Sequence, residues 1–83
     1  MPVISRFNGI IIKMYFQQAE HNPPHIHATH GEKVAAISID SGEILDGELP
    51  LKDLALVKQW IGQHKNELIQ MWKTQVFKQL PPL

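Results

Sequence analysis

The 83 residues are enough for one small domain, and eight basic residues balance eight acidic ones, so the formal net charge is zero. The absence of cysteine excludes a disulfide framework and a thiolate metal site. If so small a fold needs additional stabilisation, it would have to come from a metal held by histidine or carboxylate, or from a second chain. No apolar run approaches the roughly 20 residues of a membrane helix, and residues 1–6 lack the pattern of a signal peptide, so we expect a soluble, cytoplasmic protein.

The charges are distributed unevenly along the chain. Residues 21–50 contain one lysine and five acidic residues, whereas residues 51–83 contain five lysines and two acidic residues. These two parts could attract each other within one molecule or between two copies, which leaves a homo-oligomer open. The basic part falls short of a clear nucleic-acid footprint.

The first predicted strand covers residues 9–16, which are rich in β-branched and aromatic side chains. Strand alternation gives it one face for the core and a second face that is only partly apolar, from which Tyr15 could reach a neighbouring strand. The core face holds Ile10, Ile12, Met14 and Phe16, and the second face holds Ile11, Lys13 and Tyr15.

A stiff corner follows this strand. Pro23 and Pro24 each have a fixed φ angle and no backbone N–H, and each disfavours the α region for the residue before it. We therefore predict a polyproline-like corner that holds His21 and His25 at a nearly fixed separation, with either X–Pro bond free to be cis or trans.

Three short strands are predicted next, over residues 25–30, 33–40 and 44–48, with turns at Gly31 and Gly42. Because sequential strands joined by tight turns pair with their neighbours, they indicate an antiparallel meander. In the first of the three strands, one face carries His25, His27 and Thr29, and the other carries Ile26, Ala28 and His30.

Residues 50–78 have a helical pattern. Pro50 suits the start of a helix and Asp53 suits its dipole. Two helices with a turn near Gly62 are predicted, and one long, bent helix is the alternative, because a single glycine costs only about 1 kcal/mol. The apolar residues at helical spacing are Leu54, Val57, Trp60 and Ile61, then Leu68, Ile69, Trp72 and Val76.

These elements predict a single α+β domain over residues 1–83. It has a small antiparallel sheet of three to four strands within residues 9–49. Two C-terminal helices within residues 50–78 pack on one face of the sheet, and a short extended tail follows.

Four of the five histidines lie within residues 21–30 and allow a metal site. His25 and His27 project from one strand face, so both could bind one divalent transition metal such as zinc, nickel or copper. The expected distance from the metal to each imidazole nitrogen is about 2.0–2.1 Å. The third ligand would be His21, across the corner, or a carboxylate from another strand. The fifth histidine, His64, is placed to stabilise a helix end near the predicted turn.

The same cluster also allows two uses without a metal. His25 or His27 could act as acid or base in RNA cleavage through the 2′-hydroxyl, with Lys13 or Arg6 steadying the phosphate. Alternatively, the imidazoles could lie at a sheet edge and contact a partner strand by β-augmentation. The spacing of the residues does not choose between these uses.

Several blocks of the sequence resemble one family. They are Gly9-Ile-Ile-Ile-Lys-Met-Tyr-Phe, Glu20-His-Asn-Pro-Pro-His-Ile-His-Ala, Gly47-Glu-Leu-Pro and a helical tail with Trp60 and Trp72, and they are similar to the small bacterial family catalogued as domain of unknown function 4160. Such genes often lie beside a second small gene in an arrangement like a toxin–antitoxin module. By analogy the resemblance implies a small protein partner and an RNA-directed toxic activity. It brings no established catalytic residues, although His25 and His27 fall on its signature.

The leading hypothesis is a component of a two-protein, toxin–antitoxin-like system that engages a small protein partner. If the chain is an enzyme, it would be a small endoribonuclease-like toxin that acts on RNA through His25, His27 and Lys13. The alternatives are a transition-metal-binding module built on His21, His25 and His27, and a non-catalytic interaction protein.

Overall fold

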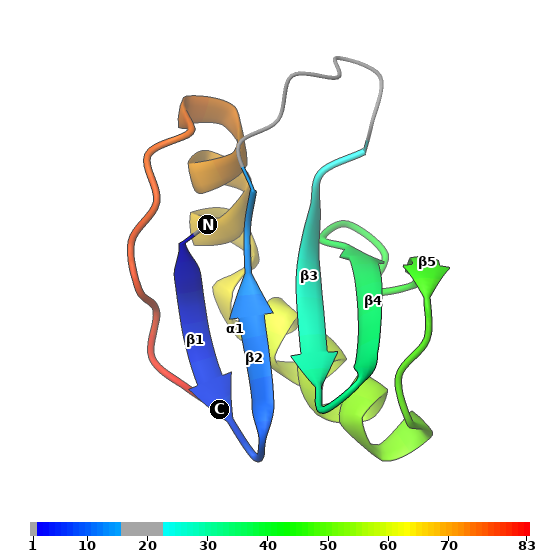
Figure 1. Cartoon of the computed structure of the whole chain (residues 1–83). Coiled ribbons are helices and arrows are strands. Elements are labelled where there is room, and N and C mark those ends of the chain that lie inside the picture. The colour runs from blue at the N-terminus through cyan, green and yellow to red at the C-terminus, as the bar shows by residue number, and fades with distance from the viewer. Residues whose placement is uncertain (1, 16–22) are drawn as a thin grey trace.

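An antiparallel sheet of five strands with one long helix on one face makes up the computed structural model of the chain (Figure 1). The structure describes residues 2–15 and 23–83. The sheet order is β1-β2-β3-β4-β5, which confirms the α+β class and the meander, with one strand more than the three to four expected. In chain order the elements are β1 (Val3–Phe7), β2 (Ile10–Lys13), β3 (His25–His30), β4 (Lys33–Ser38), β5 (Ile44–Gly47) and α1 (Leu51–Thr74).

The additional strand is β1, which forms a hairpin with β2 across Asn8 and Gly9. Both turn residues have positive φ angles, 52° and 77°, as a two-residue type I′ turn requires. The expectation that strands begin near residue 9 is corrected accordingly. Residues 3–7 lack clear alternation because the register shifts between Val3 and Ser5, so the strand contains an irregularity that period-2 patterning does not anticipate.

The hydrophobic core lies between the sheet and α1. The predicted alternation in residues 10–14 and 25–30 is confirmed, whereas the prediction for Phe16 lies outside the described residues. Trp60 is fully buried, and its ring centroid lies 5.9 Å from that of Phe7 in β1. The buried strand residues of this core are Ile4, Phe7, Ile10, Ile12, Ile26, Ala28, Ala35 and Ile37, and the buried residues of α1 are Val57, Trp60, Ile61, Leu68 and Met71.

The helical half is one helix with a kink, in place of the two helices predicted over residues 50–78. His64 has non-helical backbone angles (φ −122°, ψ 18°), two residues after the glycine where a turn was expected. The helix ends at Thr74 because Gln75 adopts the left-handed conformation, and its N–H donates to the carbonyl oxygen of Met71 at 2.9 Å. Val76 therefore lies beyond the helix with 71% of its surface exposed, not on the buried helix face that we expected.

The C-terminal tail runs beside β1, at one edge of the sheet (Figure 1). The N–H of Leu80 donates to the carbonyl oxygen of Ile4 at 2.8 Å, and the indole N–H of Trp60 donates to that of Pro81 at 2.9 Å. These contacts fix the tail, and the side chain of Leu80 is buried. In the part of the chain that the structure describes, no helix combines the length and the apolar character needed to cross a bilayer.

Candidate functional site

The sheet face opposite α1, here called the open face, carries a row of four residues that crosses four strands. The strand register pairs Lys13 with His27, His27 with Ala36, and Ala36 with Asp46. Residues directly opposite each other in an antiparallel sheet project to the same face. Because the side chain of Ala36 is a single methyl group, the row leaves free space between the imidazole of His27 and the carboxylate of Asp46.

His25 lies beside this row, and its ring is held in one orientation. The ring centroids of His25 and His27 are 5.1 Å apart, which confirms that the two histidines project together from β3. The Nδ1–H of His25 donates to the carbonyl oxygen of Pro23 at 2.9 Å. Since a carbonyl oxygen can only accept, the proton of neutral His25 is on Nδ1, and Nε2 carries the free lone pair. The residue is 9% exposed, and its ring centroid lies 5.0 Å from that of Trp72 in α1.

The environment of His27 favours the neutral imidazole. Tyr15 approaches the ring edge-on with centroids 4.5 Å apart, so Tyr15 does reach the histidine strand. Burial of the ring lowers the pKa of His27 below its usual 6.5, the neighbouring His25 lowers it further, and Asp46 partly offsets both effects. The Nδ1 atom of His27 is buried, and the described residues offer it no hydrogen-bond partner, so proton exchange with a bound group would involve Nε2. His27 is therefore mostly neutral near pH 7 and can accept a proton.

A pocket of about 320 Å³ opens over these side chains. This volume is at the small end of the range for ligand pockets, about 300–1,000 Å³, so it suits a small group and not a large cofactor. Two imidazoles and one carboxylate meet in it beside apolar walls, which is the composition expected of an acid–base site. The pocket is lined by Pro23, His25, His27, Ala36, Leu45 and Asp46.

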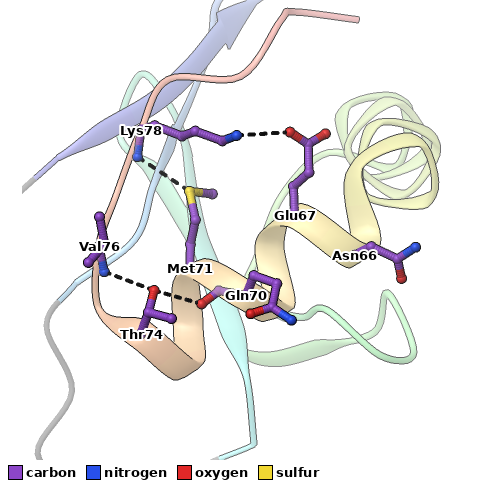
Figure 2. Close-up of a pocket in the computed structure, with 7 residues that line it drawn as sticks. All are labelled: Asn66, Glu67, Gln70, Met71, Thr74, Val76 and Lys78. Atoms are coloured by element: carbon purple, nitrogen blue, oxygen red, sulfur yellow. Dashed lines mark hydrogen bonds and ion pairs between the residues drawn. The ribbon is translucent and has the colours of Figure 1, made fainter.

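A second pocket, of about 350 Å³, lies between the last turns of α1 and the tail (Figure 2). Its charged residues, Glu67 and Lys78, point toward each other across it and form an ion pair at 3.4 Å. Met71 reaches from the helix toward the tail, where its sulfur accepts the N–H of Lys78 at 3.4 Å. Because these groups already satisfy one another and no imidazole lines this second pocket, the histidine pocket is the stronger candidate for a functional site.

The predicted catalytic residues His25, His27 and Lys13 are brought together, whereas the predicted metal ligands are brought together only in part. His21 lies outside the described residues, so its place in a metal site has no structural description. Within residues 2–15 and 23–83, no group of three or more histidine, aspartate and glutamate side chains is placed to hold a metal ion. Arg6 is on the open face as the register partner of Ile11, two strands away from His27.

The two remaining histidines have structural contacts. The Nδ1 atom of His30 lies 2.7 Å from a carboxylate oxygen of Asp53, which ties the end of β3 to the first turn of α1. His64 forms the kink, where its Nδ1 atom lies 3.4 Å from Glu67. The structural role expected for His64 therefore fits its position.

Several residues of the site, Leu45 among them, were not predicted from the sequence. Ala36 and Asp46 join it through strand register, and Trp72 joins it through the contact of its ring with that of His25, with centroids 5.0 Å apart. No local sequence signal identifies these contacts, because each depends on which residues face one another across different elements.

Comparison with known families identifies a match. Residues 9–73 match the model of a family described as Domain of unknown function (DUF4160), and this range covers more than half of the chain. No match was found among curated proteins or among solved structures.

Proposed function

The chain belongs to the DUF4160 family, and we propose that it is the RNA-directed component of a two-protein, toxin–antitoxin-like module that uses the His25–His27 pocket for acid–base chemistry. One observation carries this proposal. The rings of His25 and His27 are 5.1 Å apart at one pocket, and Lys13 is directly across the strand pair from His27. We place the module in the cytoplasm, the compartment of its RNA substrate.

The chemistry is cleavage of RNA by its own 2′-hydroxyl group. His27, which is neutral near pH 7, takes the proton from the 2′-hydroxyl, and the resulting oxyanion attacks the adjacent phosphorus. The bond to the 5′-oxygen breaks, and that leaving oxygen takes the Nε2 proton of His25 in its imidazolium form, which returns His25 to the neutral ring with Nδ1–H on Pro23. The products are a 2′,3′-cyclic phosphate and a free 5′-hydroxyl.

Two charged residues support the transfer. Lys13 lies beside His27 and can stabilise the negative charge that develops on the phosphate. Asp46, across Ala36, stabilises the imidazolium that forms when His27 accepts the proton, in the way that a carboxylate supports a catalytic histidine. The small partner protein of the module would regulate access to this face.

The test is cleavage of a short RNA by the purified chain, compared with the same RNA carrying a 2′-deoxyribose at the scissile position. We expect a cyclic phosphate from the RNA and no product from the deoxy substrate. His27→Gln and His25→Gln should each lower the rate by about 10²–10⁴-fold, the usual contribution of a general acid or base. His64→Gln, a histidine outside the pocket, is the matched control and should cleave at the parent rate.

Cleavage that persists in the double variant His25→Gln, His27→Gln would disprove the proposal, as would a parent chain without activity on RNA. Growth inhibition in cells that express the same variants gives a second measurement. Inhibition that is equal for parent and double variant would indicate a non-catalytic interaction protein.

A transition-metal module is the second candidate, and one contact favours it. Imidazoles that bind a metal through one nitrogen usually donate the other N–H to a carbonyl or carboxylate, which is the arrangement of His25 and Pro23. Calorimetric titration of the untagged chain with zinc, nickel or copper tests this candidate. Metal binding that disappears in His25→Gln, together with RNA cleavage that is abolished by EDTA, would support the metal module over metal-free catalysis.

A further inference from the structure

The two edges of the sheet differ in whether the chain itself covers them. At β1, the tail lies along the edge and is attached by the hydrogen bonds from Leu80 to Ile4 and from Trp60 to Pro81 (Figure 1). At the opposite edge, β5 pairs with β4 on one side, and no described residue pairs with it on the other. The outer backbone groups of β5 therefore have to be satisfied by water or by a strand from another chain.

The side chains of β5 are also exposed. Leu45, Asp46 and Gly47 all lie at the surface, and 47% of the surface of Leu45 is accessible. Alternate side chains of an added strand project to opposite faces of the sheet. The side chains on the same face as Leu45 can therefore make apolar contact with it.

The charge of this edge indicates what kind of segment it accepts. Glu43, Asp46 and Glu48 lie on β5 or directly next to it, and the only ion pair among them in the described structure joins Glu48 to Lys33 at 2.7 Å. A second copy of β5 paired with the first would bring the same carboxylates together, which is unfavourable. We propose that β5 accepts an extended basic segment of a partner protein as a sixth strand.

This inference rests on the proposed function only in identifying the partner with that of the two-protein module. The position of β5 links partner binding to the histidine site, because Leu45 and Asp46 line the pocket that holds His25 and His27. A lysine or arginine of the added strand that pairs with Asp46 lies at the rim of that pocket. Partner binding therefore both neutralises the carboxylate and narrows the opening.

The test uses a capped eight-residue peptide that alternates lysine and valine, and an acidic control peptide that alternates glutamate and valine. Binding to the full chain is followed by calorimetry and by amide chemical shifts. We expect the basic peptide to bind, with shift changes centred on residues 43–48 and on the adjoining part of β4, and the acidic peptide to show no binding.

Two charge reversals provide matched variants. Asp46→Lys should weaken peptide binding by at least about tenfold, whereas Glu32→Lys makes the same charge change at the exposed β3–β4 turn and should weaken it by less than about twofold. Equal weakening by both variants, or shift changes centred elsewhere, would overturn the proposal, and so would the absence of binding. A parent chain that is a dimer and dissociates when the peptide is added would assign the edge to a second copy instead.

RNA cleavage measured on the same samples separates the two proposals. A chain that cleaves RNA but ignores the basic peptide overturns only the edge assignment. A chain that binds the peptide at β5 but does not cleave RNA overturns only the catalytic function.

Discussion

His25 and His27 are two residues apart and line the same pocket, yet their ring nitrogens have different surroundings. His25 has its Nδ1–H bound to the carbonyl oxygen of Pro23, whereas the buried Nδ1 of His27 has no partner among the described residues. Burial and the proximity of His25 lower the pKa of His27. The proposed separate roles of proton donor and proton acceptor rest on these differences.

The lowered pKa of His27 predicts a stability that depends on pH. Between the usual pKa of 6.5 and the lower pKa in the folded state, the unfolded chain binds the proton and the folded chain does not. The free energy of unfolding should therefore rise with pH from pH 5 to pH 7.5, and this contribution is lost as the pH falls. Urea unfolding at several pH values measures it.

The variant His27→Gln isolates this contribution, because every other residue is the same in both chains. We expect the rise between pH 5 and pH 7.5 to be smaller in His27→Gln than in the parent. A rise of equal size in both chains would show that His27 does not titrate at a lowered pKa. Glu67, whose pKa is lowered by its hydrogen bonds to His64 and Lys78, affects stability only at more acidic pH.

At the residue scale, the sequence predicts the shared face of His25 and His27 because strand alternation is a local property. It also predicts that Tyr15 could reach them. The row from Lys13 to Asp46 could not be predicted, since it depends on the register of three strand pairs. Register is set by turns and by the hydrophobic face as a whole, and a one-residue slip would reverse it.

At the scale of single elements, regular patterns were predictable and irregular ones were not. The strand β1 was missed although Asn8-Gly9 is a strong hairpin signal, because the irregular pairing of residues 3–5 hides its alternation. The helix pattern located the break near residue 62, but the kink is at His64, where hydrogen bonding to Glu67 accompanies it. Val76 fits the helical spacing of the apolar residues and was therefore predicted on the helix, but the helix ends two residues earlier, at Thr74.

Two glycines of these elements should respond to alanine in opposite directions. Gly47 ends β5 with a φ of 78°, and an added Cβ would overlap the carbonyl oxygen of Val34, so Gly47→Ala should destabilise the fold by about 2 kcal/mol or more. Gly62 is helical with open space around it, so Gly62→Ala should stabilise the fold by up to about 1 kcal/mol. Denaturant unfolding measures both, and changes of the same sign would contradict this reading of the backbone.

At the scale of the whole molecule, the tail connects parts of the chain that are far apart in sequence. It joins the first strand to the middle of α1 through Ile4 and Trp60, and it adds the buried side chain of Leu80 to the core. The sequence predicted only a short extended tail. Its prolines indicate that the segment is not helical, but they do not indicate which strand it contacts. The edge that the tail covers was therefore not foreseen.

Two substitutions in the tail test its contribution to stability. Leu80→Ala should lower the free energy of unfolding by about 2–3 kcal/mol, since it removes a buried side chain. Val76→Ala is the matched control, because that side chain is largely exposed and its loss should change stability by less than about 0.5 kcal/mol. Thermal or urea unfolding compares the two, and a small effect of Leu80→Ala would mean that the tail detaches at little cost.

The hydrogen bond between His25 and Pro23 joins residues only two positions apart. The imidazole is thus oriented by its own segment of backbone, and the following hairpin of β3 and β4 carries the second imidazole along. The contact that orients His25 therefore lies within this segment, whereas Tyr15 and Trp72, which pack on the two rings, lie outside it. Transplanted as a hairpin into the sheet of a designed protein, residues 23–38 would bring two neighbouring histidines, one of them already oriented by Pro23, to a surface that previously had none.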